Sequence, residues 1–321
     1  MFALSEIFSI PIDSIPGLYS IFHDFLGTAG LGKTTLAGSI AEKTKAAFAN
    51  RDGRQSGYCV TEKQNRRKTM DLTFETKCWQ NDYKLMLMTD HLQRMIANCN
   101  VKFADRQLII NNVNDQDIVL AASEALKRTG TIDHVYIAEE YSEKALDYFG
   151  LERDSFKGGY YYSISELTGI FLCKTKYLLH FSSDSYIPSK YKKSHWIEDA
   201  IKIMEKNPDI VVANPTWNFK WGEAEKESAS KTDDGKFFVG QGFSDQCYLI
   251  NTQIFKEKIY NYKHPASERY PKYGGELFEK RVDSFMRVQG KKRITSTEVS
   301  YRSRNIRKYQ YYLEKSGIVR I

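Results

Sequence analysis

Y-L-L-H-F-S-S-D-S-Y-I-P, from Tyr177 to Pro188, is the segment from which we interpret the rest of the chain. Its first part is apolar and reads as a buried strand that ends at Phe181. Small and acidic residues follow, among them Asp184. An apolar strand that runs out into a carboxylate places that carboxylate at the carboxyl edge of a sheet, where open α/β sheets bind ligands. An Asp/Ser turn after an ordinary strand would look the same.

Strand-like and helix-like segments alternate from Met70 onward. We expect strands at 71–76, 106–110, 134–138, 177–181 and 210–213, and helices at 83–97, 115–126, 142–149, 165–174 and 196–206. Each strand and helix together have the length of a βαβ unit. The sequence therefore predicts an α/β fold, with a mostly parallel sheet, right-handed crossovers and flanking helices.

Polar side chains follow four of the expected strands. The clusters are Trp79/Asn81/Asp82, Asn111/Asn112/Asn114, Glu139/Glu140 and Ser182/Ser183/Asp184. The carboxyl ends of parallel strands meet at one edge of a sheet, so these clusters could together line a pocket for a base, a ribose and a metal diphosphate. The alternative is that strand ends are polar because they meet water.

Residues 1–69 read differently from the rest of the chain. G-T-A-G-L-G-K-T-T, from Gly27 to Thr35, matches the phosphate-binding P-loop, in which Lys33 would reach the terminal phosphates and Thr34 would hold Mg²⁺. The polar, basic segment from Arg51 to Thr69 reads as a linker. So short a region cannot complete a doubly wound sheet, and we interpret it as a poorly integrated extension with a P-loop fragment. A P-loop NTPase or kinase remains the alternative.

Composition excludes some classes of protein. The net charge of +7 is spread along the 321 residues without the long basic tract of a nucleic-acid binder. The five cysteines are widely spaced and form no CxxC pair, which favours a reducing compartment, and we predict a cytoplasmic protein. No apolar run is long enough to cross a bilayer. The basic, tyrosine-rich tail at 301–321 favours a terminal helix, with contact to a membrane surface or a phosphorylated acceptor as the alternative.

Over residues 70–300 the order of these elements resembles the GT-A glycosyltransferases, in particular the family 2-like group. Y-L-L-H-F-S-S-D-S lies where that family has F-L-D-x-D, so Asp184 matches the second Asp and Ser182 replaces the first. Asn112 and Asn114 stand where the family usually has Asp. The resemblance implies a nucleotide-diphosphate-sugar donor, a glycan or other hydroxyl acceptor, and Mn²⁺ or Mg²⁺ bound by Asp184.

The resemblance also implies the remaining site residues. A nucleoside would lie against residues at the ends of three strands, namely Thr76, Trp79, Asn81, Asn112, Asn114, Ser182 and Ser183. The catalytic base would be Glu279 or Glu276 in Y-G-G-E-L-F-E-K-R, with Asp245 as a further candidate. The competing interpretation of the two glutamates is that the helix dipole favours acidic residues in the first turn of any helix.

Two tryptophans, Trp217 and Trp221, fall in the loop where an acceptor sugar would lie. Their rings could stack on a pyranose or simply cover a sheet edge. A non-catalytic nucleotide- or glycan-binding protein of the same fold remains open, because Ser182 cannot carry the charge of the missing Asp. A sugar nucleotidyltransferase is less favoured, because its Gly-rich loop is missing between Lys77 and Asp82.

Overall fold

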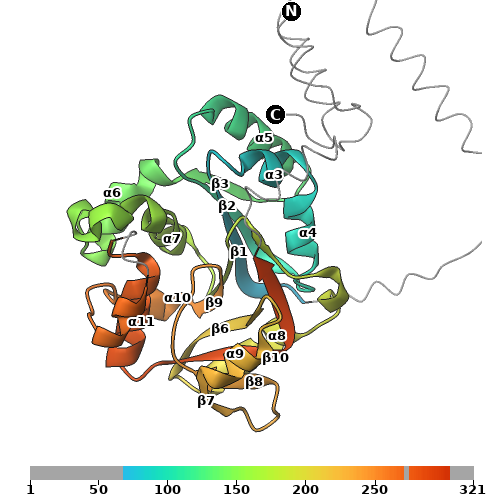
Figure 1. Cartoon of the computed structure of the whole chain (residues 1–321). Coiled ribbons are helices and arrows are strands. Elements are labelled where there is room, and N and C mark those ends of the chain that lie inside the picture. Colours follow the sequence, from blue (N-terminus) through green and yellow to red (C-terminus); the bar gives the residue numbers. More distant parts are fainter. Residues whose placement is uncertain (1–67, 271–274, 304–321) are drawn as a thin grey trace, which may run out of the picture. The chain divides into compact units, whose positions relative to one another are not determined.

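The computed structural model describes residues 68–270 and 275–303. The P-loop-like stretch with Lys33 and Thr34, nearly all of the proposed 1–69 extension, and residues 304–321 of the tail lie outside the described residues. Within the described residues, ten strands form one sheet in the order β3-β2-β1-β4-β9-β6-β10-β8-β7, and β5 pairs with β10 (Figure 1). The strands are β1 (Met70–Cys78), β2 (Phe103–Ile110), β3 (His134–Ile137), β4 (Tyr177–Phe181), β5 (Ser185–Tyr186), β6 (Ile210–Trp217), β7 (Ser228–Lys231), β8 (Phe237–Gly240), β9 (Cys247–Asn251) and β10 (Lys292–Ser303).

The sheet is mostly parallel, as the sequence predicts. β1 pairs in parallel with β2 and β4, β2 with β3, and β6 with β10. β9 runs antiparallel between β4 and β6, which therefore point the same way. As a consequence, β1, β2, β4, β6 and β10 all end at one edge of the sheet, and β9 begins there.

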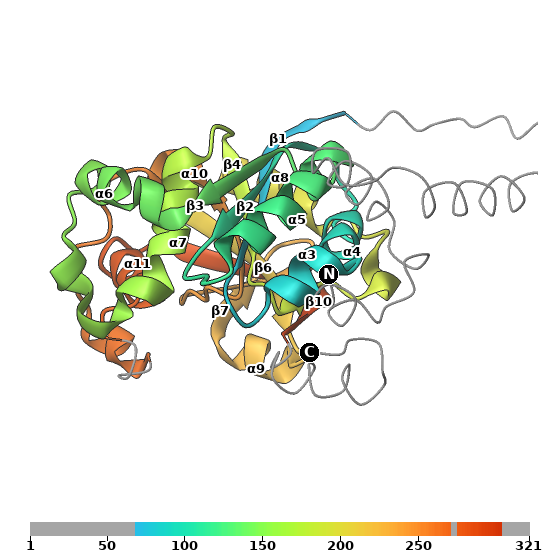
Figure 2. The same ribbon diagram turned by 90° about the horizontal axis from the view of Figure 1, so that it is seen from above.

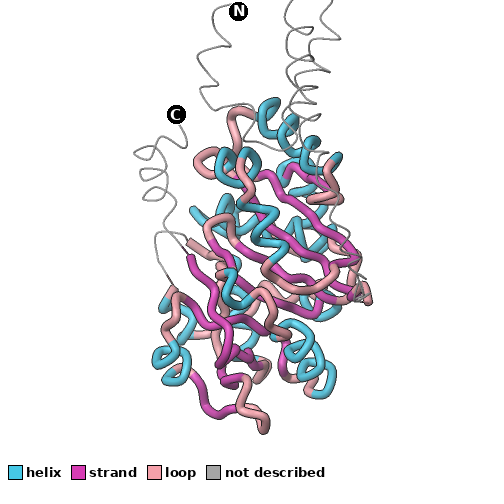
Figure 3. The backbone as a smooth tube through the Cα atoms, turned by 90° about the vertical axis from the view of Figure 1, so that its right-hand side faces the viewer, coloured by secondary structure: helices cyan, strands magenta, loops and turns pink. Residues whose placement is uncertain are grey.

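Two layers of helices cover the sheet (Figure 2). One face packs against α3 (Tyr83–Met88), α4 (His91–Ala97), α5 (Gln116–Arg128) and α8 (Trp196–Lys206), and the other against α6 (Ala138–Phe149), α7 (Tyr160–Leu172), α10 (Thr252–Phe255) and α11 (Phe278–Val288). Alternate residues of β4 serve the two cores: Leu179 packs on the α3 side and Leu178 on the α7 side. The strands lie between the helices in Figure 3, which explains why β4 is buried throughout.

Tertiary pairing moves several boundaries away from those expected. β1 continues through Lys77 to Cys78, because its last residues pair with the end of β2. β6 continues to Trp217, which pairs with Tyr301 of β10. Glu139 and Glu140, expected in a strand exit, lie in the first turn of α6.

The single helix expected at 83–97 is two helices, broken at Thr89. The Thr89 hydroxyl donates to the carbonyl of Leu85 (2.6 Å) and accepts from the backbone N–H of His91 (3.1 Å). Such local side-chain bonds compete with the helical ladder. Periodicity alone does not register that competition, because the apolar face continues through both helices.

Candidate active site

The ends of β1, β2 and β4 are hydrogen-bonded into one rim. Asp82, fully buried at the start of α3, accepts from the backbone N–H of Trp79 (2.7 Å) and from the hydroxyl of Ser183. The backbone N–H of Gln80 donates to the carbonyl of Asn112 (3.3 Å), and its amide oxygen accepts from the backbone N–H of Asn114 (2.8 Å). Three of the four polar clusters that the sequence singles out therefore share one edge.

Asp184 is half-buried beyond the end of β4. Its Oδ2 accepts a hydrogen bond from Ser303 (3.0 Å) and its Oδ1 accepts one from Ser185 (3.3 Å). Burial raises the pKa of Asp184, and the two hydroxyl groups oppose that shift. The backbone N–H of Asp184 itself also donates to this carboxylate, so three of its four or so acceptor positions are used and about one remains for a further ligand.

Lys77 is surrounded by carboxylates from several elements. It forms an ion pair with Glu166 of α7, whose side chain is fully buried. Burial alone would lower the pKa of Lys77, but the negative charges of Glu166 and Asp245 hold that pKa above its usual value. Among the described residues, no group of three or more His, Cys, Asp or Glu side chains is arranged to hold a metal ion.

Glu279 occupies the first turn of α11, where the sequence predicts a catalytic base. The backbone N–H of Asp245 donates to its carboxyl group. Burial raises the pKa of Glu279 to about 8, and the negative charge of Asp245 adds to that shift. A carboxyl group whose pKa lies near neutrality is suited to accept a proton from a hydroxyl.

The two other candidate bases differ from Glu279. Asp245 precedes β9, and burial raises its pKa while the charge of Lys77 opposes the shift. Glu276 is bound by Lys280 (3.1 Å) and Lys157 (3.6 Å). Burial would raise the pKa of Glu276, but these lysines outweigh it and hold the pKa below its usual value. Glu276 is therefore held in its charged form by two lysines, whereas the pKa of Glu279 is raised.

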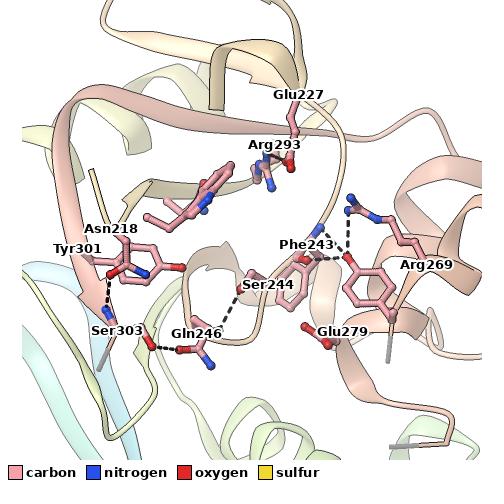
Figure 4. Close-up of a pocket in the computed structure, with 13 residues that line it drawn as sticks. Asn218, Glu227, Phe243, Ser244, Gln246, Arg269, Glu279, Arg293, Tyr301 and Ser303 are labelled. Atoms are coloured by element: carbon pink, nitrogen blue, oxygen red, sulfur yellow. Dashed lines mark hydrogen bonds and ion pairs between the residues drawn. The ribbon is translucent and has the colours of Figure 1, made fainter. Parts of the chain in front are cut away.

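A cavity of about 420 Å³ opens beside these groups (Figure 4). Its lining includes Trp217 from β6, Gln246 from the loop before β9, Glu279 from α11, and Arg293 and Ser303 from β10. Ser303 connects the cavity to Asp184 through the hydrogen bond described above. Trp221, at the start of α9 (Trp221–Lys226), is not among the described residues that line it.

Three residues that the resemblance assigns to the nucleoside are occupied elsewhere. Thr76 is fully buried within β1 and donates to the carbonyl of Phe181 (2.8 Å), so it cannot reach a ligand. Ser182 donates to the carbonyl of Asp245 (3.1 Å), and Ser183 donates to Asp82. These two hydroxyl groups fasten the loop after β4 to its neighbours.

The other expected nucleoside residues lie on the exposed rim, namely Trp79, Asn81, Asn112 and Asn114. Sequence reasoning missed the contributions of Lys77, Gln246, Arg269, Arg293 and Ser303. The only sequence signal for Lys77 was its position directly after the strand expected at 71–76. The arginines lie in segments that read only as polar.

No protein family model and no curated protein matches this chain. Solved GT-A glycosyltransferases do match it. Residues 1–349 of S. aureus TarS are 12% identical with a TM-score of 0.39, covering 78% of this chain and 65% of the TarS fragment. The chain thus spans less than two thirds of that fragment.

Two further matches are of the same kind. Glucosyl-3-phosphoglycerate synthase from Mycobacterium tuberculosis, in complex with Mn²⁺, UDP and phosphoglyceric acid, is 13% identical with a TM-score of 0.38 and covers 79% of this chain and 77% of that one. GalNAc-T7 with UDP, GalNAc and Mn²⁺ is 10% identical with a TM-score of 0.42 and covers 74% of this chain and 44% of that one.

Proposed function

We propose that the protein is a glycosyltransferase that moves a sugar from a nucleotide-diphosphate-sugar donor to a hydroxyl group of an acceptor. The observation that carries the proposal is the cavity at the carboxyl edge of the sheet. Glu279 borders it, and so does Ser303, whose hydroxyl group holds Asp184. Glu279, the proposed proton acceptor, thus lines the cavity, and Asp184, the proposed metal ligand, is hydrogen-bonded to a residue that lines it.

Asp184 fits the role of a ligand to Mg²⁺ or Mn²⁺. Its carboxylate accepts from two hydroxyl groups and from its own backbone N–H, which leaves about one acceptor position for a cation. Mg²⁺ at nucleotide sites is commonly bound by one or two carboxylates together with phosphate oxygens of the substrate. A bound cation would neutralise the charge that develops on the departing diphosphate.

Glu279 is the proposed base. In an inverting transfer the acceptor oxygen attacks the anomeric carbon, and the bond from that carbon to the diphosphate oxygen breaks. The hydroxyl proton passes to the carboxylate of Glu279, for which burial and Asp245 maintain a high proton affinity. Asp245 acts by its position beside the base, through its backbone N–H and its charge.

The nucleoside is proposed to lie along the rim formed by the ends of β1 and β2. Trp79 is 39% exposed there, and Asn112 follows at the end of the neighbouring strand. An exposed indole can stack on a base, and exposed amides can bond a base or ribose. Residues 70–300 would form the glycosyltransferase domain, and the four described cysteines, free and buried, are consistent with a cytoplasmic location.

The proposal is tested by a thermal-shift panel on the full chain with UDP-, GDP-, dTDP- and CDP-sugars, with and without Mn²⁺. We expect one nucleotide to raise the melting temperature, and Mn²⁺ to increase that shift. Release of the nucleoside diphosphate then separates an enzyme from a binding protein. If no nucleotide shifts the melting temperature of a folded sample, the proposal is wrong.

The P-loop alternative predicts a different pattern. In that case Lys33→Ala would abolish nucleotide binding, whereas the transferase proposal predicts that Lys33→Ala binds as the parent does. For Asp184→Ala the expectations are reversed. The transferase proposal predicts loss of nucleotide binding, whereas the P-loop alternative predicts binding like that of the parent. The two variants therefore show whether a nucleotide binds at the P-loop-like stretch or at the candidate site around Asp184.

A further inference from the structure

Two arginines border the same small space in the cavity. A carbon atom added to Gly242 would lie 2.7 Å from Nη2 of Arg269 and 3.4 Å from Nη1 of Arg293. Gly242 also has a φ of +105°, which side chains rarely adopt. Both guanidinium groups thus approach one backbone position, and Figure 4 shows them near each other along the cavity wall.

Each guanidinium group has one carboxylate partner among the described residues, and both ion pairs are long. Arg293 is only 5% exposed, and its Nη2 lies 3.4 Å from Glu227. Its buried Nε has no hydrogen-bond partner in the part of the chain that is described. Arg269 lies 3.7 Å from Asp283, which Arg287 already binds at 2.7 Å. Two like charges therefore stand together with incomplete compensation.

Aromatic side chains hold both groups in place. The guanidinium of Arg269 lies 5.1 Å from the ring centre of Tyr270, and that of Arg293 lies 5.6 Å from the ring centre of Trp217. The Tyr270 hydroxyl accepts from Arg269 (3.3 Å) and donates to the carbonyl of Phe243 (2.6 Å). Guanidinium groups fixed in this way are suited to bind phosphate or carboxylate oxygens through paired N–H groups.

We propose that Arg269 and Arg293 form an anion-binding subsite for a phosphate or carboxylate group on the acceptor. In Figure 4 the two guanidinium groups lie away from Ser303, the residue that holds Asp184, so the subsite is separate from the proposed diphosphate position. Glu279 lines the same cavity, which would place an acceptor hydroxyl within reach of the base. The assignment to the acceptor rests on the proposed function.

The test titrates inorganic phosphate into the full chain saturated with UDP and Mg²⁺, by calorimetry at low salt, with acetate as a carboxylate probe. Arg269→Gln should weaken phosphate binding about tenfold, the effect of losing one charged hydrogen bond. Arg153→Gln is the matched control, because its side chain is 44% exposed, as that of Arg269 is, and it does not line the cavity. Glu227→Gln should strengthen binding, because it removes the carboxylate that faces Arg293.

The outcomes separate this subsite from the proposed function. Equal phosphate affinity in Arg269→Gln and the parent overturns the subsite, and competition between phosphate and UDP in the parent overturns its assignment to the acceptor. If UDP itself does not bind, the proposed function is wrong, but the titration without nucleotide still tests the two arginines. Unchanged UDP affinity in Arg269→Gln, together with weakened phosphate binding, supports the proposal.

Discussion

The hydroxyl group of Ser303 donates a hydrogen bond to Oδ2 of Asp184 over 3.0 Å, although 119 residues separate the two in the sequence. The amide group of Gln246 lies 2.7 Å from the same hydroxyl and 3.1 Å from that of Ser185, which also bonds Asp184. A hydroxyl has one hydrogen and cannot donate to both neighbours. Every group is satisfied when the NH₂ of Gln246 donates to the two hydroxyls and each hydroxyl donates to Asp184.

Gln246→Glu tests this arrangement. The new carboxylate would compete for both hydroxyl hydrogens and repel Asp184, so we expect the affinity for UDP with Mn²⁺ to fall about tenfold. Gln289→Glu is the control. Gln289 is exposed, bonds Tyr262 and does not line the cavity, so the same added charge should leave the affinity for UDP unchanged. Calorimetric titration of both variants provides the measurement. Parent-like binding by Gln246→Glu would show that the amide does not position Asp184.

Asp184→Asn keeps the shape of the side chain and removes its charge. We expect the nucleotide to lose the part of its stabilising effect that depends on Mn²⁺, a drop in affinity of about tenfold or more. The measurement is the melting temperature with UDP, with and without Mn²⁺. Asp209→Asn is the control, because Asp209 is an exposed partner of Lys291 outside the cavity lining. An undiminished Mn²⁺ effect in Asp184→Asn contradicts the proposed metal ligand.

The activity should depend on pH through Glu279. Its pKa is raised to about 8, so below that pH the group is protonated and cannot accept a proton. We therefore expect kcat/KM of the transfer to rise as pH increases toward 8 and then level off. Glu279→Gln should lower kcat by roughly 100-fold or more and remove this dependence.

Asp245→Asn tests whether Asp245 only adjusts the pKa of Glu279 or is itself the catalytic base. The variant removes a negative charge that raises the pKa of Glu279, so the midpoint of the pH profile should move to lower pH while activity remains. Loss of activity at every pH, with the fold and UDP binding intact, would instead make Asp245 the base. The measurement is the pH dependence of kcat/KM for the parent and the variant.

Five of the ten described strands, namely β1, β2, β3, β4 and β6, could be predicted from the sequence because their signals are local. The apolar run from Tyr177 to Phe181 and the 3.6-residue spacing in the helices each report on the burial of one element. The polar strand ends could be predicted for the same reason, and those of β1, β2 and β4 lie together. The residues at which strands end were harder to predict. β1 reaches Cys78 because it pairs with β2, and such pairing is not visible in the sequence of one segment.

The residues that complete the candidate site arise from long-range pairing. Arg293 and Ser303 lie near the two ends of β10. Pairing with β6 and β8 positions Arg293, and pairing with β5 positions Ser303, so that both line the cavity. No local pattern marks either residue. Thr76 shows the opposite case, because a polar side chain near a strand end looked like a ligand contact, yet its hydroxyl is used between two central strands.

Gly169 in α7 is explained by its approach to Glu75 of β1. A carbon atom added at Gly169 would lie 1.9 Å from Oε2 of Glu75. That carboxyl group is fully buried and cannot shift freely, because it also bonds Gln107 and His180 (2.9 Å). We expect Gly169→Ala to lower the free energy of unfolding by roughly 1–3 kcal/mol, as overpacking a core does.

Gly222 in α9 is the matched control for Gly169. An added carbon atom there meets nothing within 4 Å. Gly222→Ala should therefore raise the free energy of unfolding by about 0.5–1 kcal/mol, through helix propensity alone. Urea denaturation of both variants measures the two effects, which should have opposite signs. A Gly169→Ala variant as stable as Gly222→Ala would mean that Glu75 moves aside at no cost, and the buried contacts of that carboxyl group would then not be rigid.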